Sequence, residues 1–154
     1  MRGRFLLRKC KYVLKFLFLS DRFYIDHLKF TEIEQKQTRP YVRVEIEING
    51  TLFGIPLRSN ISHPHVYWTD KANKCGVDFS KAVVISKPDV YIDQAKKPRI
   101  RPDEFESLRG KDHIIKQRML KYIADYKKAK ANPDVPRNAL LLRYSTLQYF
   151  EEYI

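Results

Sequence analysis

The chain has 154 residues, of which 44% are hydrophobic and 13% aromatic, and its formal net charge at pH 7 is +12. This hydrophobic content excludes an intrinsically disordered chain, and the length suits a single domain. Two cysteines, Cys10 and Cys75, exclude a disulfide-dense secreted scaffold and a zinc site made of cysteines alone. The positive charge predicts a polyanionic partner, with a basic but functionally neutral surface as the alternative.

The N-terminal end divides into a basic extension, residues 1–14, and the start of a single domain over residues 15–154. Residues 12–19 (YVLKFLFL) resemble a short signal-peptide core, but Lys15 interrupts them and Ser20-Asp21-Arg22 is not a cleavage site. No apolar run reaches the roughly 18 residues that a membrane span needs. We therefore expect a cytoplasmic protein.

Hydrophobic alternation predicts a β-hairpin in the middle of the chain. Residues 41–48 (YVRVEIEI) alternate strictly, with the aliphatic positions on one face. Asn49-Gly50 is the strongest two-residue hairpin signal, and residues 51–57 return as the partner strand, with Pro56 at its end or at a sheet edge. Further strands are expected at residues 15–19, 82–86 and 90–93.

Helical periodicity is clearest over residues 111–131, where Ile115, Met119, Tyr122 and Tyr126 form one apolar stripe. A shorter helix is expected at residues 21–29 with Asp21 as its N-cap, and a capping box predicts another over residues 145–152. Residues 96–102 (KKPRIRP) form a basic loop. The pattern indicates an α+β fold with a small, strongly bent antiparallel sheet and helices packed around it.

The densest polar cluster follows the hairpin, at residues 58–65 (RSNISHPH). One interpretation is a turn whose Ser and Asn bond their own backbone. The other is a site for RNA cleavage, which needs a proton acceptor for the ribose 2′-OH, a proton donor for the leaving 5′-oxygen, and donors on the phosphate. The candidates are His63 and His65 as acid and base, Arg39, Arg58 and Lys81 as phosphate-binding cations, and Ser59 as a hydroxyl donor.

The same residues allow other uses. His63 and His65 form an H-x-H pair with Asp70, Cys75 and Asp78 nearby, which makes metal binding a rival, although the spacing matches no standard zinc pattern. The glycines build no phosphate-cradling loop, so ATP-dependent chemistry is not expected. Aromatic residues flank the cluster and either stack on RNA bases or belong to the core: Tyr41, Tyr67, Trp68 and Phe79.

Several segments in order resemble the toxin endoribonucleases of type III toxin–antitoxin systems, the family of ToxN, AbiQ and TenpN. They are Arg39-Pro40-Tyr41-Val42, Glu45-Ile46-Glu47-Ile48-Asn49-Gly50, Ile55-Pro56-Leu57-Arg58-Ser59, His63, and Gly76-Val77-Asp78-Phe79-Ser80-Lys81-Ala82-Val83-Val84-Ile85. The part from Ile55 onward looks most like the TenpN branch. Weaker similarity extends the resemblance to residues 15–154.

The resemblance implies a highly twisted antiparallel sheet or barrel like that of MazF-type ribonucleases, with added helices. It implies cleavage of cellular or phage mRNA without a metal or other cofactor, leaving 2′,3′-cyclic phosphate ends. It also implies inhibition by a repetitive pseudoknot RNA in a toxin–RNA assembly, without a protein antitoxin or a membrane, and a role in abortive phage infection.

The family's best-known active-site position corresponds to Ser59, and a basic residue before the first long strand corresponds to Arg39. The ToxN branch has Thr-Ser-Pro-Lys where this chain has Arg58-Ser59-Asn60-Ile61, so Arg58 or Lys81 would replace the lost lysine. His63 is the candidate acid or base by the titration argument above. The expected catalytic set is Arg39, Ser59, His63 and Lys81, and the expected RNA-binding set is Tyr41, Arg58, Asn60, His65, Lys116 and Gln117.

Two other functions fit the charge. A non-catalytic basic RNA-binding protein is the main alternative, because charge and aromatic content suit it equally. A DNA-binding regulator fits less well, since no helix-turn-helix or basic-zipper pattern is present.

Overall fold

A computed structural model describes residues 14–33 and 41–154. The strands are β1 (Lys15–Leu17), β2 (Arg43–Ile48), β3 (Thr51–Arg58), β4 (Val66–Asp70), β5 (Cys75–Asp78) and β6 (Val83–Val84). The helices are α2 (Asp21–Asp26), α3 (Pro88–Tyr91), α4 (Pro102–Leu108), α5 (Asp112–Ala131) and α6 (Pro136–Tyr144). Short 3₁₀ turns follow β5 and α6: η1 (Phe79–Lys81), η2 (Thr146–Tyr149) and η3 (Glu151–Tyr153).

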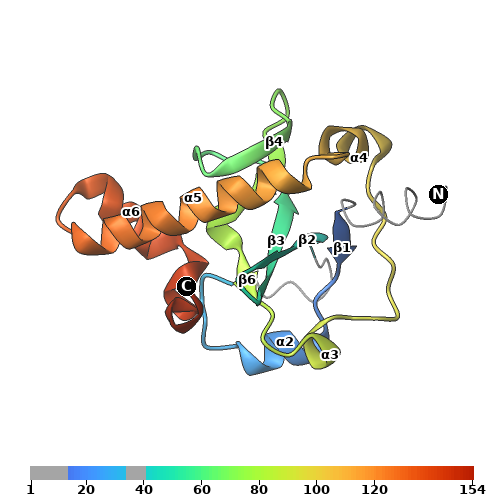
Figure 1. Cartoon of the computed structure of the whole chain (residues 1–154), viewed down its shortest axis with the longest axis horizontal. Helices are drawn as coiled ribbons and strands as arrows, with labels where there is room; N and C mark the ends of the chain where they lie inside the picture. Colours follow the sequence, from blue (N-terminus) through green and yellow to red (C-terminus); the bar gives the residue numbers. More distant parts are fainter. Residues whose placement is uncertain (1–13, 34–40) are drawn as a thin grey trace, which may run out of the picture.

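The strands form one antiparallel sheet in the order β1-β2-β3-β5-β4, with β6 also paired to β3. The long helix α5 crosses the sheet, with α4 near its N-terminal end and α6 at its C-terminal end, while α2 and α3 lie side by side away from it (Figure 1). The predicted α+β class and antiparallel sheet are therefore confirmed. The sheet is not closed, so the described residues do not form a complete barrel.

The predicted hairpin joins β2 to β3. Asn49 (φ 50°) and Gly50 (φ 81°) both adopt the left-handed conformation that a two-residue turn requires, and Ile48 pairs with Thr51. The aliphatic face of β2 is buried as expected. The opposite face is not fully exposed, because the Arg43 guanidinium is buried and its Nη1 donates to the carbonyl oxygens of Gly54 and Lys81.

Pro56 lies inside β3 rather than at its end. The neighbouring amide of Leu57 donates to the Val42 carbonyl on the β2 side, so the Pro56 nitrogen faces the other side. There the partner of β3 changes from β6, which pairs at Gly54, to β5, which pairs at Leu57. Proline is tolerated because no strand needs its missing N–H at this junction.

Helix α5 confirms the predicted apolar stripe, since Ile115, Met119, Tyr122 and Tyr126 are all buried. Ser145 caps the turn that follows α6, as the capping box predicts, but the segment folds as the two 3₁₀ turns η2 and η3 instead of one helix. Within the described ranges no helix has the length and apolarity to span a membrane.

Four predictions about elements are wrong in detail. Residues 90–93 do not form a strand: Pro88 begins the short helix α3, and only Ile92 bridges to Leu19. Helix α2 begins after Ser20, whose Oγ accepts from the Phe23 amide, so Asp21 is not the N-cap, and α2 ends at Asp26.

Residues 96–102 are a loop only up to Pro102, which starts α4. Leu14, assigned to the N-terminal extension, is part of the core, while residues 1–13 lie outside the described part.

Candidate functional site

Residues 58–65 connect the end of β3 to β4, and a hollow of about 260 Å³ opens beside them. We call it the β3–α4 hollow. It is lined by Tyr41, Leu57, Arg58, Ser59, Cys75, Arg101 and Glu104. The fold thus brings together three predicted site residues, Tyr41, Arg58 and Ser59, and adds Arg101 and Glu104 from the start of α4.

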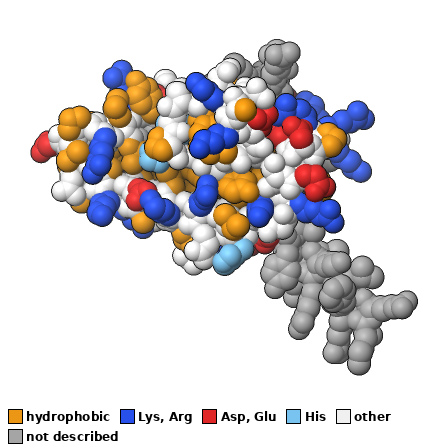
Figure 2. All heavy atoms as spheres, turned by 90° about the horizontal axis from the view of Figure 1, so that it is seen from above, with side chains coloured by type: hydrophobic (Ala, Val, Ile, Leu, Met, Phe, Trp, Pro, Cys, Tyr) orange, Lys and Arg blue, Asp and Glu red, His pale blue; other side chains and the backbone are white. Residues whose placement is uncertain are grey.

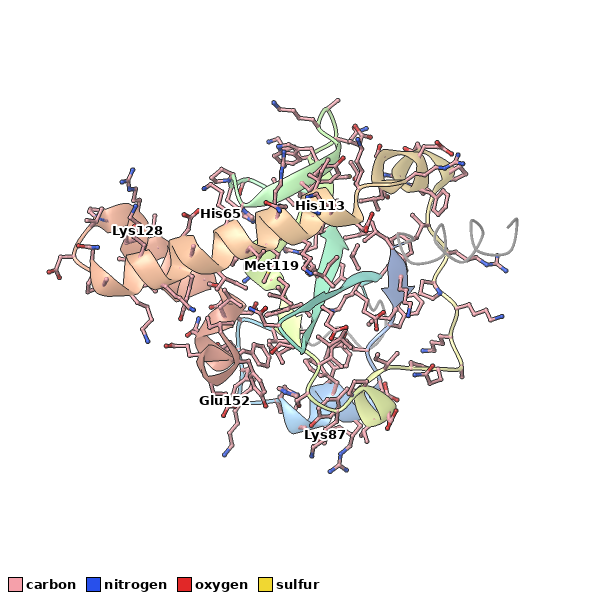
Figure 3. The ribbon with its side chains drawn as sticks, viewed as in Figure 1. His65, Lys87, His113, Met119, Lys128 and Glu152 are labelled. Atoms are coloured by element: carbon pink, nitrogen blue, oxygen red, sulfur yellow. The ribbon has the colours of Figure 1, made fainter. Side chains whose placement is uncertain are left out.

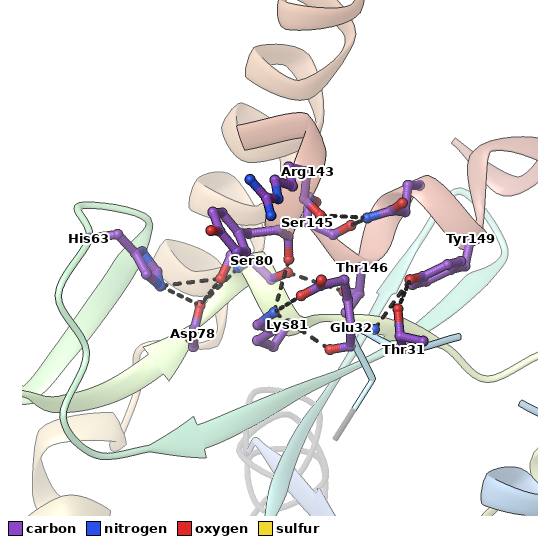
Figure 4. Close-up of polar contacts among 12 residues, drawn as sticks. Thr31, Glu32, His63, Asp78, Ser80, Lys81, Arg143, Ser145, Thr146 and Tyr149 are labelled. Carbon is purple, nitrogen blue, oxygen red and sulfur yellow. Dashed lines mark hydrogen bonds and ion pairs between the residues drawn. The ribbon is translucent and has the colours of Figure 1, made fainter. Parts of the chain in front are cut away.

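The buried carboxylate of Asp78, at the end of β5, fixes one wall of this region. Its Oδ2 accepts from Arg58 Nη1 at 2.6 Å. Its Oδ1 lies 2.6 Å from Ser80 Oγ and 3.1 Å from His63 Nε2 (Figure 4). Burial raises the pKa of Asp78, but hydrogen bonding and charge from His63, together with hydrogen bonds from Ser80 and Arg58, outweigh it and hold the pKa below its ordinary value. Asp78 therefore stays ionised and orients the Arg58 guanidinium.

His63 is held at both ring nitrogens. Nδ1 accepts from the His65 backbone amide at 3.1 Å, so in the neutral ring Nε2 carries the proton and donates toward Asp78. Nε2 also lies 3.2 Å from Ser80 Oγ. In this arrangement His63 supports Asp78, and it does not line the β3–α4 hollow.

Ser59 and Asn60 form the exposed turn that leaves β3. Asn60 adopts a left-handed φ of 56°, which asparagine tolerates better than most residues. The next amide, that of Ile61, donates to the Lys74 carbonyl and ties the turn to the loop before β5. The turn interpretation thus fits Asn60, while Ser59 reaches the hollow.

Lys81 lies on the other side of Arg58. Its Nζ contacts Glu32 Oε2 at 3.1 Å and the Tyr144 carbonyl at 2.9 Å (Figure 4). A second, smaller depression there is lined in part by Lys81, Tyr41 and Arg58, so the two depressions meet at Tyr41 and Arg58. Arg39 lies outside the described residues.

Four predicted RNA-binding residues do not line the hollow: Asn60, His65, Lys116 and Gln117. The His65 ring packs edge-on against Tyr122 of α5, with ring centres 5.3 Å apart. Lys116 and Gln117 are exposed, directly after the buried Ile115, and Gln117 Nε2 lies 3.5 Å from His113 Nε2. Figure 3 shows His65 beside α5 and His113 at the N-terminal end of that helix.

His65 gives the fold a predicted pH dependence. Desolvation, aided by nearby His63 and Lys121, lowers the His65 pKa, and it outweighs the opposite effect of Asp125 and Asp78. The unfolded chain then binds a proton at His65 more readily than the folded chain does. Neutral His65 therefore contributes its full share to the free energy of unfolding above the ordinary histidine pKa, and this contribution is lost as pH falls below about 6.5. We expect the melting temperature to fall between pH 7.5 and pH 5.5, as measured by circular dichroism.

The matched variants for this measurement are His65→Phe, which keeps a ring against Tyr122, and His113→Gln on the exposed surface. His65→Phe should flatten the fall in melting temperature, and His113→Gln should leave it unchanged. An equally steep fall in wild type and His65→Phe would show that another group is responsible.

The face that carries β4 and α5 mixes hydrophobic side chains with many Lys and Arg side chains, while acidic side chains gather toward one end (Figure 2). One such acidic segment is α4, with Asp103, Glu104 and Glu106. Across residues 14–33 and 41–154, no three His, Cys, Asp or Glu side chains gather closely enough to hold a metal ion.

The sequence did not indicate Arg101, Glu104 or the contacts that Asp78 makes with Arg58, His63 and Ser80. The sequence places Arg101 in a basic loop, although Pro102-Asp103-Glu104 is a helix-start signal that puts Glu104 in a first turn. The sequence makes Asp78 a candidate metal ligand, whereas the structure pairs it with Arg58 and His63.

Comparison with known proteins adds no relative: the chain matches no family model, no curated protein and no solved structure.

Proposed function

We propose that the protein is a metal-independent endoribonuclease and the toxin of a type III toxin–antitoxin system, most like the TenpN branch. The observation that carries the proposal is the β3–α4 hollow, whose lining combines Arg58 and Arg101 with Ser59 and Tyr41. Two cations, a hydroxyl and an aromatic surface are what a nucleotide with its phosphate requires.

Each group has a role in binding RNA. Arg58 lies at the end of a strand and is anchored by buried Asp78, so its guanidinium keeps one direction. Its carbon Cζ lies 5.8 Å from the centre of the Tyr41 ring, which places the cation next to a surface on which a base can stack. We assign the phosphate to Arg58 and Arg101 and a flanking base to Tyr41.

The proposed reaction uses these groups. The ribose 2′-oxygen attacks the adjacent phosphorus, the bond to the 5′-oxygen breaks, and the product is a 2′,3′-cyclic phosphate and a 5′-hydroxyl end. Negative charge builds on the non-bridging oxygens, where Arg58, Arg101 and the Ser59 hydroxyl donate hydrogen bonds. No cofactor takes part in this scheme.

The control of the enzyme is proposed from the resemblance and the charge. The net charge of +12 favours binding of a folded RNA, and we propose a repetitive pseudoknot RNA that covers the site in a toxin–RNA assembly. The MazF-like form of the sheet, the cytoplasmic location and the role in phage defence belong to the same proposal. Lys81, Lys116 and Gln117 remain predicted RNA contacts in it.

Ser59→Ala tests the proposal. Removing one neutral donor from the site should lower the rate of RNA cleavage about 10- to 100-fold, because donors to a developing oxyanion matter most in the transition state. The affinity for RNA and the melting temperature should change little, since Ser59 is exposed. Ser62→Ala is the matched control, an exposed serine in the same segment that does not line the hollow. Equal losses of binding and cleavage would assign Ser59 to binding alone.

Expression in a bacterial host tests the toxin part with the same variants. Wild-type protein should arrest growth, and the arrest should vanish either with Ser59→Ala or when upstream DNA encoding the repeat RNA is supplied. A harmless, well-folded wild-type protein would instead favour the non-catalytic RNA-binding function.

A further inference from the structure

We infer that Glu104 is the general base of this site and takes the proton of the ribose 2′-OH. The inference rests on the proposed ribonuclease function and adds a catalytic residue to it. It starts from the composition of the β3–α4 hollow, where Glu104 carries the only carboxylate among the described lining residues.

The fold positions this carboxylate on a rigid element. Pro102 starts helix α4, and Glu104 follows within its first turn. Helix α4 is docked on β4 through Ser107, whose Oγ donates to the Thr69 carbonyl at 3.0 Å and whose own carbonyl accepts from Tyr67 Oη at 3.1 Å. Glu104 therefore reaches the hollow from a helix that is fixed to the sheet.

The two carboxylate oxygens are oriented by protein donors. Arg101 Nε donates to Oε1 at 2.8 Å, and Thr69 Oγ1 lies 3.4 Å from Oε2. A carboxylate offers about four acceptor positions, so these two contacts fix its orientation and still permit a further donor. The Glu104 side chain keeps 14% of its surface exposed, which leaves it accessible to a substrate hydroxyl.

The other candidate proton acceptors fit this role less well. His63 is engaged at Nδ1 by the His65 amide and at Nε2 by Asp78, and His65 packs on Tyr122 outside the hollow. Cys75 also lines the hollow, but its thiol donates to the Asn73 carbonyl at 3.5 Å.

The Glu104 carboxylate accepts the 2′-OH proton as the 2′-oxygen forms its bond to phosphorus. The bond between phosphorus and the 5′-oxygen breaks, and the departing oxygen takes a proton from water. Glu104 then returns its proton to solvent, and no oxidant, reductant or further reactant is needed.

Polar and charged groups from the neighbouring elements lie near the Glu104 carboxylate or near Arg101, which pairs with it. Arg101 precedes α4 and Arg58 comes from β3, while Asp103 lies on α4 itself. Asp70, at the end of β4, and Cys75, on β5, also act electrostatically on Arg101. The two arginines share the hollow with Glu104 and sit beside the phosphate charge as it grows.

The test compares Glu104→Gln and Glu104→Asp with Glu106→Gln, a control on the same helix whose carboxylate is 67% exposed and lies outside the hollow. The substrate is a labelled transcript that wild-type protein cleaves. Glu104→Gln should lower kcat about 100-fold with KM nearly unchanged, and it should lack the low-pH decline of kcat/KM that wild type is expected to show. Glu104→Asp should retain that decline at a reduced kcat, and Glu106→Gln should behave like wild type.

Two results separate the possible failures. If wild-type protein cleaves RNA and Glu104→Gln cleaves it within about threefold of wild type, the assignment of Glu104 is overturned and the ribonuclease function stands. If wild-type protein leaves total bacterial RNA intact, the proposed function fails, and Glu104 loses its role with it. A variant of Glu104 that misfolds is replaced by Glu104→Asp, whose pH profile still decides the question.

Discussion

Arg58→Ala is expected to lower the rate of RNA cleavage about 100- to 1000-fold, the effect of removing one strong donor from a site where negative charge develops. Arg58 lines both depressions, as Tyr41 does, and its Nη1 contacts the buried Asp78 carboxylate at 2.6 Å. The rate is measured on a labelled transcript at saturating protein, where RNA affinity no longer limits cleavage.

Arg58→Lys separates an effect on the rate of cleavage from an effect on the stability of the fold. Lysine keeps the charge beside Asp78 but loses the planar fork that binds two phosphate oxygens at once, so cleavage should fall while the melting temperature stays close to wild type. Arg109→Ala, at an arginine that is 72% exposed and paired only with neighbouring Glu106 among the described contacts, is the matched control. Full cleavage by Arg58→Lys would show that Arg58 acts only as a charge.

Asp78→Ala is expected to destabilise the fold by about 3 kcal/mol, at the lower end for breaking a buried ion pair because Arg58 is 20% exposed. The substitution also removes the acceptor for the Ser80 amide and the partner of His63 Nε2. For a chain of this length, this loss corresponds to a fall in melting temperature of about 10 °C. Chemical denaturation followed by circular dichroism measures it.

The control for Asp78 is Asp125→Ala, because Asp125 forms an exposed ion pair with Lys121 and such pairs contribute little. The double variant Asp78→Ala with Arg58→Ala should be less destabilised than the sum of the two single variants, since neither charge is then left without the other. A fall of about 10 °C in melting temperature is expected for Asp78→Ala. A melting temperature within about 2 °C of wild type would contradict the structural role assigned to Asp78.

Local sequence patterns were sufficient to predict the elements whose conformation depends on residues close together in the chain. The Asn49-Gly50 turn follows from backbone conformations that few other residues adopt, and α5 follows from an apolar stripe that only a helix places on one face. Proline marks a boundary without showing which side of it is helical, and Pro88, Pro102 and Pro136 each begin a helix.

The site could be predicted only where its residues are neighbours in sequence. Arg58 and Ser59 follow directly from the hairpin, and Tyr41 precedes it. Arg101 and Glu104 join them through the packing of α4 on β4, and no local pattern reports that contact. For the same reason, no local pattern reports the pairing of His63 with Asp78, which comes from the strand that lies beside β3.

The most direct test of the central claim is the chemistry of the RNA ends. Purified wild-type protein is incubated with total bacterial RNA in excess EDTA, and the new termini are mapped. The proposed mechanism predicts discrete cuts with 2′,3′-cyclic phosphate on one side and 5′-hydroxyl on the other, absent from a parallel reaction with Arg58→Ala. Intact RNA, or cuts that carry 5′-phosphate ends, would contradict it.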